Sequence, residues 1–157
     1  MPAGSGKPAN DPCPGTIRVV LAPLRMSVPP DPATLHDVRL AVQRWLTEAG
    51  ADHVDDVVLA VNEAVANAIE HARVPRRDPT GPEPATGAAH VDGIVLTAEV
   101  IDTRFRLRVV DQGTWRPNEA DDRRGRGLSI VRAVMDTVDL AHGEGPTTVV
   151  MERRLVV

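Results

Sequence analysis

The stretch from Val57 to Ala72, VVLAVNEAVANAIEHA, restricts the possible folds more than any other part of this chain. At about 100° per residue, its apolar side chains fall on one broad arc of a helix. The arc is formed by Val57, Val58, Val61, Ala64, Val65, Ala68, Ile69 and Ala72. Because such an arc must be covered by another layer, the pattern predicts a helix over about 52–73 that packs on a sheet.

Three polar residues, Glu63, Asn67 and His71, interrupt this helix at every fourth position. Residues four apart lie on the same side of a helix, so the three form a stripe along one edge of the apolar arc. Ala60 lies beside the stripe in projection, where a larger side chain would crowd it. Taken alone, the stripe fits a solvated flank and a ligand-binding edge equally well.

The composition predicts one globular domain with an aliphatic core. The chain has 157 residues, of which 42% are hydrophobic and 25% are charged. A chain of this length can bury a substantial core. Trp45, Phe105 and Trp115 are its only aromatic residues. Residues 1–15 are rich in Pro and Gly and are typical of a disordered tail, so we place the domain at 16–157.

Charge and cysteine content exclude several classes of protein. The net charge is −4, no basic block stands out, and few aromatic residues are present, which argues against direct nucleic-acid binding. Cys13 is the single cysteine, so an internal disulfide and a cysteine-based zinc cluster are excluded. The sequence shows neither an apolar run of about 20 residues nor an apolar signal core at its start. We therefore expect a cytoplasmic protein without a membrane span.

The remaining patterns predict the other elements. A strand is expected over about 17–21, with 24–28 continuing or pairing with it, and a helix over about 31–50 is capped by Asp31 and Pro32 and followed by Gly50. Pro- and Gly-rich residues 74–90 predict a loop. The alternation in the next segment predicts a hairpin, 94–101 and 104–110, with one buried face. A third helix over 128–138 and two strands within 137–142 and 147–157 complete the chain.

The order strand, helix, helix, hairpin, helix, hairpin predicts an α+β fold. Clustered hairpins favour a mixed, mostly antiparallel sheet, and the helices should cover one of its faces. We therefore expect a two-layer α/β sandwich.

Two segments downstream could carry chemistry. In VVDQGTW, Asp111 and Gly113 directly follow a buried strand, where backbone can approach a ligand; an ordinary turn is the alternative. In RRGRGL, Gly125 and Gly127 precede the predicted third helix and Arg123 lies close by. A helix N-terminus with glycines and arginines suits phosphate binding, whereas a plain loop into a helix is the alternative.

Together the three segments resemble the ATP-binding domains of the GHKL superfamily, and most closely the bacterial anti-sigma-factor serine/threonine kinases. The pattern E-x3-N-x3-H resembles that family's N box, D-Q-G its G1 box, and G-R-G-L its G2 box. The resemblance extends over about residues 16–157. It implies the histidine-kinase-like ATPase fold, also called the Bergerat fold, and binding of ATP with Mg²⁺.

The resemblance also implies roles for single residues. Asn67 should ligate Mg²⁺, Glu63 should orient or deprotonate the attacking hydroxyl, and His71 should line the phosphate end of the site. Asp111 should accept a hydrogen bond from the adenine amino group, while Gly113 lets the backbone pass under the base.

The G2 box and the closing strand supply the other expected contacts. Gly125 and Gly127, with Leu128 after them, should form the hinge of a lid over the phosphates, and Arg123 should reach the terminal phosphate. Thr147 or Thr148 should contact adenine from the sheet, and of the two we favour Thr148.

As a function, the resemblance implies a Mg·ATP-dependent kinase that phosphorylates an anti-anti-sigma partner with a STAS domain and sequesters a sigma factor. It also suggests a homodimer. Two alternatives stay open: a non-catalytic ATP-binding module that switches partners, and a detached histidine-kinase ATPase domain. The short lid, 114–124, favours the stand-alone kinase, whereas the long 74–90 loop departs from the family pattern.

Overall fold

The computed structural model describes residues 21–72, 93–111, 125–141 and 146–155. In chain order the elements are β1 Leu24–Val28, the short 3-10 helix η1 Pro32–Thr34, α1 Leu35–Glu48, α2 Val54–Ala72, β2 Ile94–Ile101, β3 Arg104–Asp111, α3 Gly125–Val134, β4 Thr137–Ala141 and β5 Thr147–Arg154. None of the helices in these ranges is long and apolar enough to cross a membrane.

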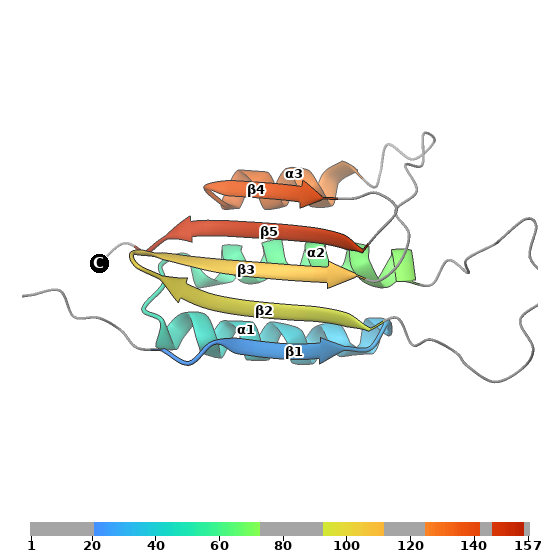
Figure 1. Cartoon of the computed structure of the whole chain (residues 1–157), viewed down its shortest axis with the longest axis horizontal. Helices are drawn as coiled ribbons and strands as arrows, with labels where there is room; N and C mark the ends of the chain where they lie inside the picture. Colours follow the sequence, from blue (N-terminus) through green and yellow to red (C-terminus); the bar gives the residue numbers. More distant parts are fainter. Residues whose placement is uncertain (1–20, 73–92, 112–124, 142–145, 156–157) are drawn as a thin grey trace, which may run out of the picture.

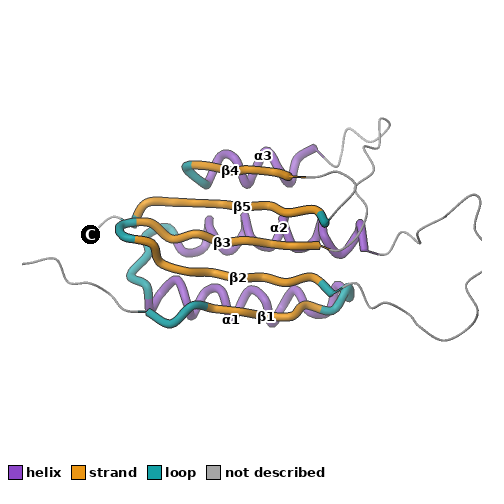
Figure 2. Tube along the Cα trace, in the orientation of Figure 1, coloured by secondary structure: helices purple, strands orange, loops and turns teal. Residues whose placement is uncertain are grey.

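The strands form one five-stranded sheet in the order β1-β2-β3-β5-β4. Every neighbouring pair of described strands is antiparallel. Helices α1, α2 and α3 all lie on one side of the sheet (Figure 1), and the opposite side is covered by no described element (Figure 2). The predicted α+β, two-layer sandwich is therefore confirmed. We call the two sides of the sheet the covered face and the open face.

Helix α2 is the centre of the helical layer. Its valines at 57, 61 and 65 and Ile69 are buried, together with three alanines on the same side. They join Phe105 and Leu107 of β3 in one core cluster. The helix predicted over 52–73 is thus confirmed, and its apolar arc is the surface that packs on the sheet.

The β2–β3 hairpin separates the two faces as its alternation predicts. Phe105, Leu107 and Val109 are buried under the helices, and the arginines between them lie on the open face. The turn is made by residues 102 and 103, where Asp102 has a φ of 55°. Aspartate tolerates this left-handed conformation better than most residues.

The start and end of the first helical segment also match their sequence signals. The Oδ1 of Asp31 accepts a hydrogen bond of 2.9 Å from the backbone N–H of Ala33, and Pro32 opens the 3-10 turn that leads into α1. Gly50 follows the end of α1 with a φ of 71°, which glycine adopts without strain.

The third helix differs from its prediction. It begins at Gly125 and ends at Val134, so the two glycines lie in its first turn rather than before it. Its expected last residues do not belong to it, because Thr137 and Val138 pair with β5 as part of β4. Glycine has a low helix propensity, but the packing of α3 on α2 stabilises the helical conformation of this segment.

Several other predictions fall on residues outside the described ranges. These are most of the first predicted strand, 17–20, the loop 74–90 and the lid 114–124. Leu21 is described and lies outside any strand, and the sheet begins at β1.

Candidate functional site

A small pocket opens where α2 and α3 cross the ends of β3, β4 and β5. It is lined by Ala64, Asn67, Ala68, His71, Val109, Asp111, Leu128, Leu140, Thr147 and Val149. Most of these side chains are aliphatic, and the polar ones gather toward its rim and floor. The enclosed space is ≈ 20 Å³, enough for about one water molecule.

Two buried polar residues form the floor of the pocket. Asp111 is 1% exposed and Thr147 is 5% exposed, and they are the buried polar residues of the described ranges. They are direct cross-strand partners, Asp111 on β3 and Thr147 on β5. Within the described part of the chain, the Oγ1 of Thr147 has no hydrogen-bond partner. Buried polar groups in folded proteins usually have partners, so this floor suits a polar ligand.

The strand pattern explains why these two residues point into the pocket. Alternate residues of a strand face the same side of the sheet. Asp111 therefore continues the covered-face series of Phe105, Leu107 and Val109, at the point where β3 ends. The same rule places Thr147 on the covered face, two residues before Val149.

The polar stripe of α2 runs along one side of the pocket. Asn67 and His71 line it directly, and Glu63 lies one helical turn earlier on the same edge. All three are half-buried. The apolar arc of α2 packs on the sheet, so the stripe lies at the edge of this packed surface, on the side where α3 approaches.

Gly127 brings α3 into contact with this stripe. A Cβ atom at Gly127 would lie 3.0 Å from the Oε2 of Glu63 and 3.2 Å from the Nδ2 of Asn67. These separations are tighter than ordinary contacts, so any larger residue would push against both side chains. The first turn of α3 therefore rests directly on Glu63 and Asn67.

The structure places the predicted site residues as follows. Asn67, His71, Asp111 and Leu128 line one pocket, and Glu63 and Gly127 meet at its edge. The backbone of Gly125 lies in the first turn of α3. Gly113 and Arg123 lie outside the described residues.

Of the two threonines considered, Thr147 lines the pocket and the favoured Thr148 does not. Thr148 pairs with Val110, which places it on the open face. The sequence alone does not show which of the two threonines faces the helices, because the alternation of β5 is compatible with either one on the covered face. Sequence reasoning also missed the aliphatic walls, Val109, Leu140 and Val149, although the same alternation would have pointed to them.

The oxygen donors at the pocket edge suit a metal ion that arrives with a ligand. Within the described ranges, no group of three or more His, Cys, Asp or Glu side chains could hold a metal by itself. Glu63 and Asn67 offer carboxylate and amide oxygens on successive turns. Mg²⁺ is commonly bound by one or two protein oxygen ligands together with phosphate oxygens, so the amide oxygen of Asn67 fits an ion of that kind, with the carboxylate of Glu63 one turn away on the same edge.

Comparison with known proteins shows which family this fold belongs to. Residues 28–153 match the family model described as histidine kinase-like ATPase domain. The chain is 26% identical over 142 residues to the serine-protein kinase RsbW of Staphylococcus epidermidis, covering 79% of this chain and 82% of that protein. It is 28% identical over 131 residues to the serine-protein kinase RsbW of Bacillus subtilis, covering 79% and 81%.

A solved structure is also similar. The crystal structure of the RsbU and RsbW domains of Rv1364c from Mycobacterium tuberculosis superposes with a TM-score of 0.63 and 30% identity, over 85% of this chain. Our chain spans about a third of that protein's solved chain, 32%. The family model covers most of the chain, and it includes both the stripe of α2 and the buried end of β3. This protein belongs to the histidine kinase-like ATPase domain family.

Proposed function

We propose that this protein is a Mg·ATP-dependent serine/threonine kinase that phosphorylates a STAS-domain anti-anti-sigma partner and sequesters a sigma factor. The observation that carries the proposal is the junction of the buried Asp111–Thr147 floor and the Glu63–Asn67 edge under the first turn of α3. One end of this site suits a base and the other suits phosphates. The similarity to proteins named serine-protein kinase supports the same reaction class.

The floor of the pocket has the chemistry of an adenine site. Its walls are aliphatic, which suits the faces of a planar ring. A buried carboxylate such as that of Asp111 accepts a hydrogen bond from an amino group, and the Oγ1 of Thr147 can donate or accept beside it. Because the enclosed space is only ≈ 20 Å³, entry of a purine ring requires the pocket walls to open.

The edge of the pocket has the chemistry of a phosphate site. Asn67 would hold the Mg²⁺ ion, which supplies neutralisation of the phosphate charges when it is bound. The first turn of α3 presents backbone N–H groups and the positive end of the helix dipole. Gly127 keeps this turn close to the stripe because it has no side chain.

Glu63 is the residue we assign to the transfer step. Its carboxylate would orient the hydroxyl of the partner's serine or threonine and take its proton. The hydroxyl oxygen then bonds to the terminal phosphorus, the bond to the bridging oxygen breaks, and ADP leaves. Little covalent work falls to the protein in such a reaction, and most of the catalysis is positioning.

We include three more residues in the proposed nucleotide site only because of their positions in the motifs: Gly113, Arg123 and Gly125. Gly113 would let the backbone pass the base, Gly125 would belong to the lid hinge, and Arg123 would reach the terminal phosphate. His71 would line the phosphate end of the pocket.

A pair of asparagines on α2 tests the site. Asn67→Ala should weaken Mg·ATP binding roughly tenfold or more, because a charge-assisted contact is lost. Asn62→Ala is the matched control, since Asn62 lies on the same helix and its Oδ1 faces Arg39 of α1 at 3.5 Å. Isothermal titration with and without Mg²⁺ measures both. Equal affinities in Asn67→Ala and wild type would contradict the assignment.

Transfer itself is tested with purified protein, labelled Mg·ATP and candidate STAS-domain proteins. The kinase should label one of them on serine or threonine. Tight ATP binding without transfer to any candidate would instead favour a nucleotide-gated binding module. Glu63 favours the enzyme, because a binding module has no need of a carboxylate at that edge.

A further inference from the structure

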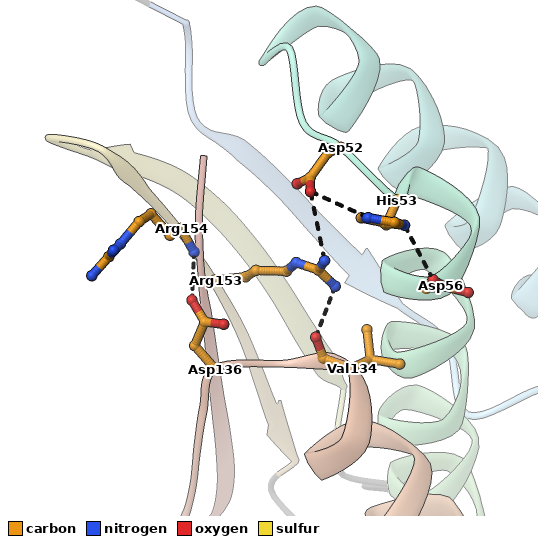
Figure 3. A network of polar contacts seen from close by, with 7 residues as sticks. All are labelled: Asp52, His53, Asp56, Val134, Asp136, Arg153 and Arg154. Carbon is orange, nitrogen blue, oxygen red and sulfur yellow. Dashed lines mark hydrogen bonds and ion pairs between the residues drawn. The ribbon is translucent and has the colours of Figure 1, made fainter. Parts of the chain in front are cut away.

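Arg153 occupies the end of the helical layer that lies farthest from the pocket. It belongs to β5 and pairs with Phe105, so its side chain enters the covered face rather than the open one. The side chain is 18% exposed. Figure 3 shows it reaching from β5 between the start of α2 and the end of α3.

Its guanidinium contacts both helices. One nitrogen, Nη1, donates a hydrogen bond of 2.8 Å to the carbonyl oxygen of Val134, the last residue of α3. The other, Nη2, lies 3.7 Å from the Oδ2 of Asp52, two residues before α2 begins. One side chain thus joins the sheet, the C-terminal end of α3 and the entry to α2.

Both contacts suit an arginine in particular. The last carbonyls of a helix lack partners within the helix and carry its partial negative charge. A planar guanidinium can donate to such a carbonyl and to a carboxylate at the same time. Neighbouring contacts hold the exit from α3 in place: the backbone N–H of Asp136 donates to the carbonyl of Glu152 at 3.0 Å, and the Oδ2 of Asp136 accepts from the backbone N–H of Arg154 at 2.8 Å.

The other end of α3 is the part that forms the site. Gly127 rests on Glu63 and Asn67, and Leu128 forms a wall of the pocket. Gly127 lies seven residues before Val134, which is about 10 Å along a helix. A helix this short behaves as a rigid rod, so a shift at its clamped end changes the tilt of its first turn.

We propose that Arg153 is a positioning residue that sets how α3 lies over α2, and thereby the spacing of Gly127 and Leu128 from the site. Its effect on catalysis rests on the proposed kinase function, whereas its effect on the position of Gly127 does not. Arg153 lies at the end of α3 opposite the pocket and acts through its contacts with Val134 of α3 and with Asp52 at the entry to α2.

The adjacent arginine provides a matched control. Arg154 is at the same end of β5 but pairs with Arg104 on the open face, and its side chain is exposed. The test compares Arg153→Met and Arg154→Met by two-dimensional amide NMR of the protein without nucleotide, by thermal unfolding and by Mg·ATP titration. Methionine keeps much of the apolar stem and removes the donors.

In Arg153→Met the amide signals of Gly127 and Leu128 should shift, although these residues lie at the opposite end of α3. Mg·ATP affinity should fall about three- to tenfold, as expected for a change in a coupled contact network. Phosphoryl transfer at saturating ATP should fall further, roughly ten- to a hundredfold, because transfer depends on geometry to within about an ångström. Arg154→Met should change none of these readouts.

Two more variants separate positioning from a general loss of stability. Arg153→Lys can donate to the Val134 carbonyl and should partly restore the Gly127 signal and the affinity. Asp52→Asn weakens the second contact and should shift the same signals less. If Arg153→Met does not fold, the amide signals of Gly127 and Leu128 in Arg153→Lys and Asp52→Asn test the proposal instead.

The proposal is overturned if the Gly127 signal stays in place in Arg153→Met while the melting temperature falls, or if Arg154→Met shifts it equally. A wild-type protein that binds no ATP would refute the kinase function alone, because the amide signals still report the position of α3.

Discussion

The covered and open faces of the sheet both carry polar side chains, but of different kinds. On the covered face, Asp111 and Thr147 are buried side by side among aliphatic residues. On the open face, Arg106 and Glu152 pair at 2.6 Å while staying partly exposed, with 41% and 22% of their side chains accessible. Burial of polar groups such as the first pair is costly unless they are hydrogen-bonded, whereas the second pair costs little to keep or to lose.

This difference indicates where function lies in the fold. A polar residue in contact with water needs no special explanation, whereas a polar residue inside an apolar pocket does. If the comparison holds, substitutions on the covered face near α3 should affect nucleotide binding and transfer, and substitutions on the open face should affect only stability, and only slightly.

The largest effect is expected at the edge of the pocket. Glu63→Gln keeps the shape of the side chain but removes its basic oxygen, so phosphoryl transfer should fall about 10²- to 10⁴-fold, the range for a lost general base. Mg·ATP affinity should change little. Single-turnover measurement of partner phosphorylation, with ATP titration alongside, checks both.

Glu70→Gln is the matched control, because Glu70 lies on the same helix and is exposed. Full transfer activity in Glu63→Gln would remove the catalytic role of this residue and leave the pocket as a binding site alone.

A smaller but still large effect is expected at the pocket floor. Asp111→Asn replaces a carboxylate with an amide of the same shape, and its lost charged hydrogen bond should cost about 1.5–3 kcal/mol of ATP binding. The free energy of unfolding should not fall by a similar amount, because a buried charge is costly to hold. Calorimetric ATP titration and urea unfolding measure the two quantities. A fall in stability with unchanged affinity would mean that Asp111 serves the fold and not the ligand.

The elements with a strong period can be predicted from the sequence. The apolar arc of α2 and the alternation of the hairpin each determine both the type of element and the side that is buried. These patterns alone therefore place Asp111 next to a buried strand end, and Asn67 and His71 on one helical edge. Their meeting in one pocket follows from how these elements pack.

The remaining features depend on tertiary contacts that leave weak local signals. The pattern predicts the start of α3 too late, because glycines disfavour helices and the close approach of Gly127 to Glu63 and Asn67 leaves no local signal in the sequence. The choice between Thr147 and Thr148 depends on the register of β5. Arg153 looks like its neighbour Arg154 in sequence, and only the pairing of β5 separates the residue that clamps α3 from the one on the open face.

A third substitution sharpens the comparison by separating stability from function at one position. Gly127→Ala adds a methyl group 3.0 Å from the Oε2 of Glu63 and 3.2 Å from the Nδ2 of Asn67. Alanine favours a helix by up to about 1 kcal/mol over glycine, so the free energy of unfolding should rise by less than that amount. Mg·ATP affinity should fall severalfold, because the side chains of Glu63 and Asn67 must shift away from the added methyl group.

Thermal unfolding and ATP titration of the same sample test whether stability rises while Mg·ATP affinity falls. Tighter ATP binding in Gly127→Ala would show that the contact between α3 and the stripe is not part of the nucleotide site.

The smallest effect is expected on the open face. Glu152→Gln weakens the 2.6 Å contact with Arg106 and a longer one of 3.9 Å with Arg104. Exposed pairs contribute about 0.2–1 kcal/mol, so the loss of stability should lie in that range, and it should shrink at high salt because screening weakens the pair in the wild type. Mg·ATP affinity should equal that of the wild type, since the side chain and the pocket lie on opposite faces of one sheet. Urea unfolding at low and high salt, with ATP titration, measures all three. A loss of ATP affinity as large as that of Asp111→Asn would mean that the sheet transmits charge changes between its faces, and the separation of function to the covered face would then fail.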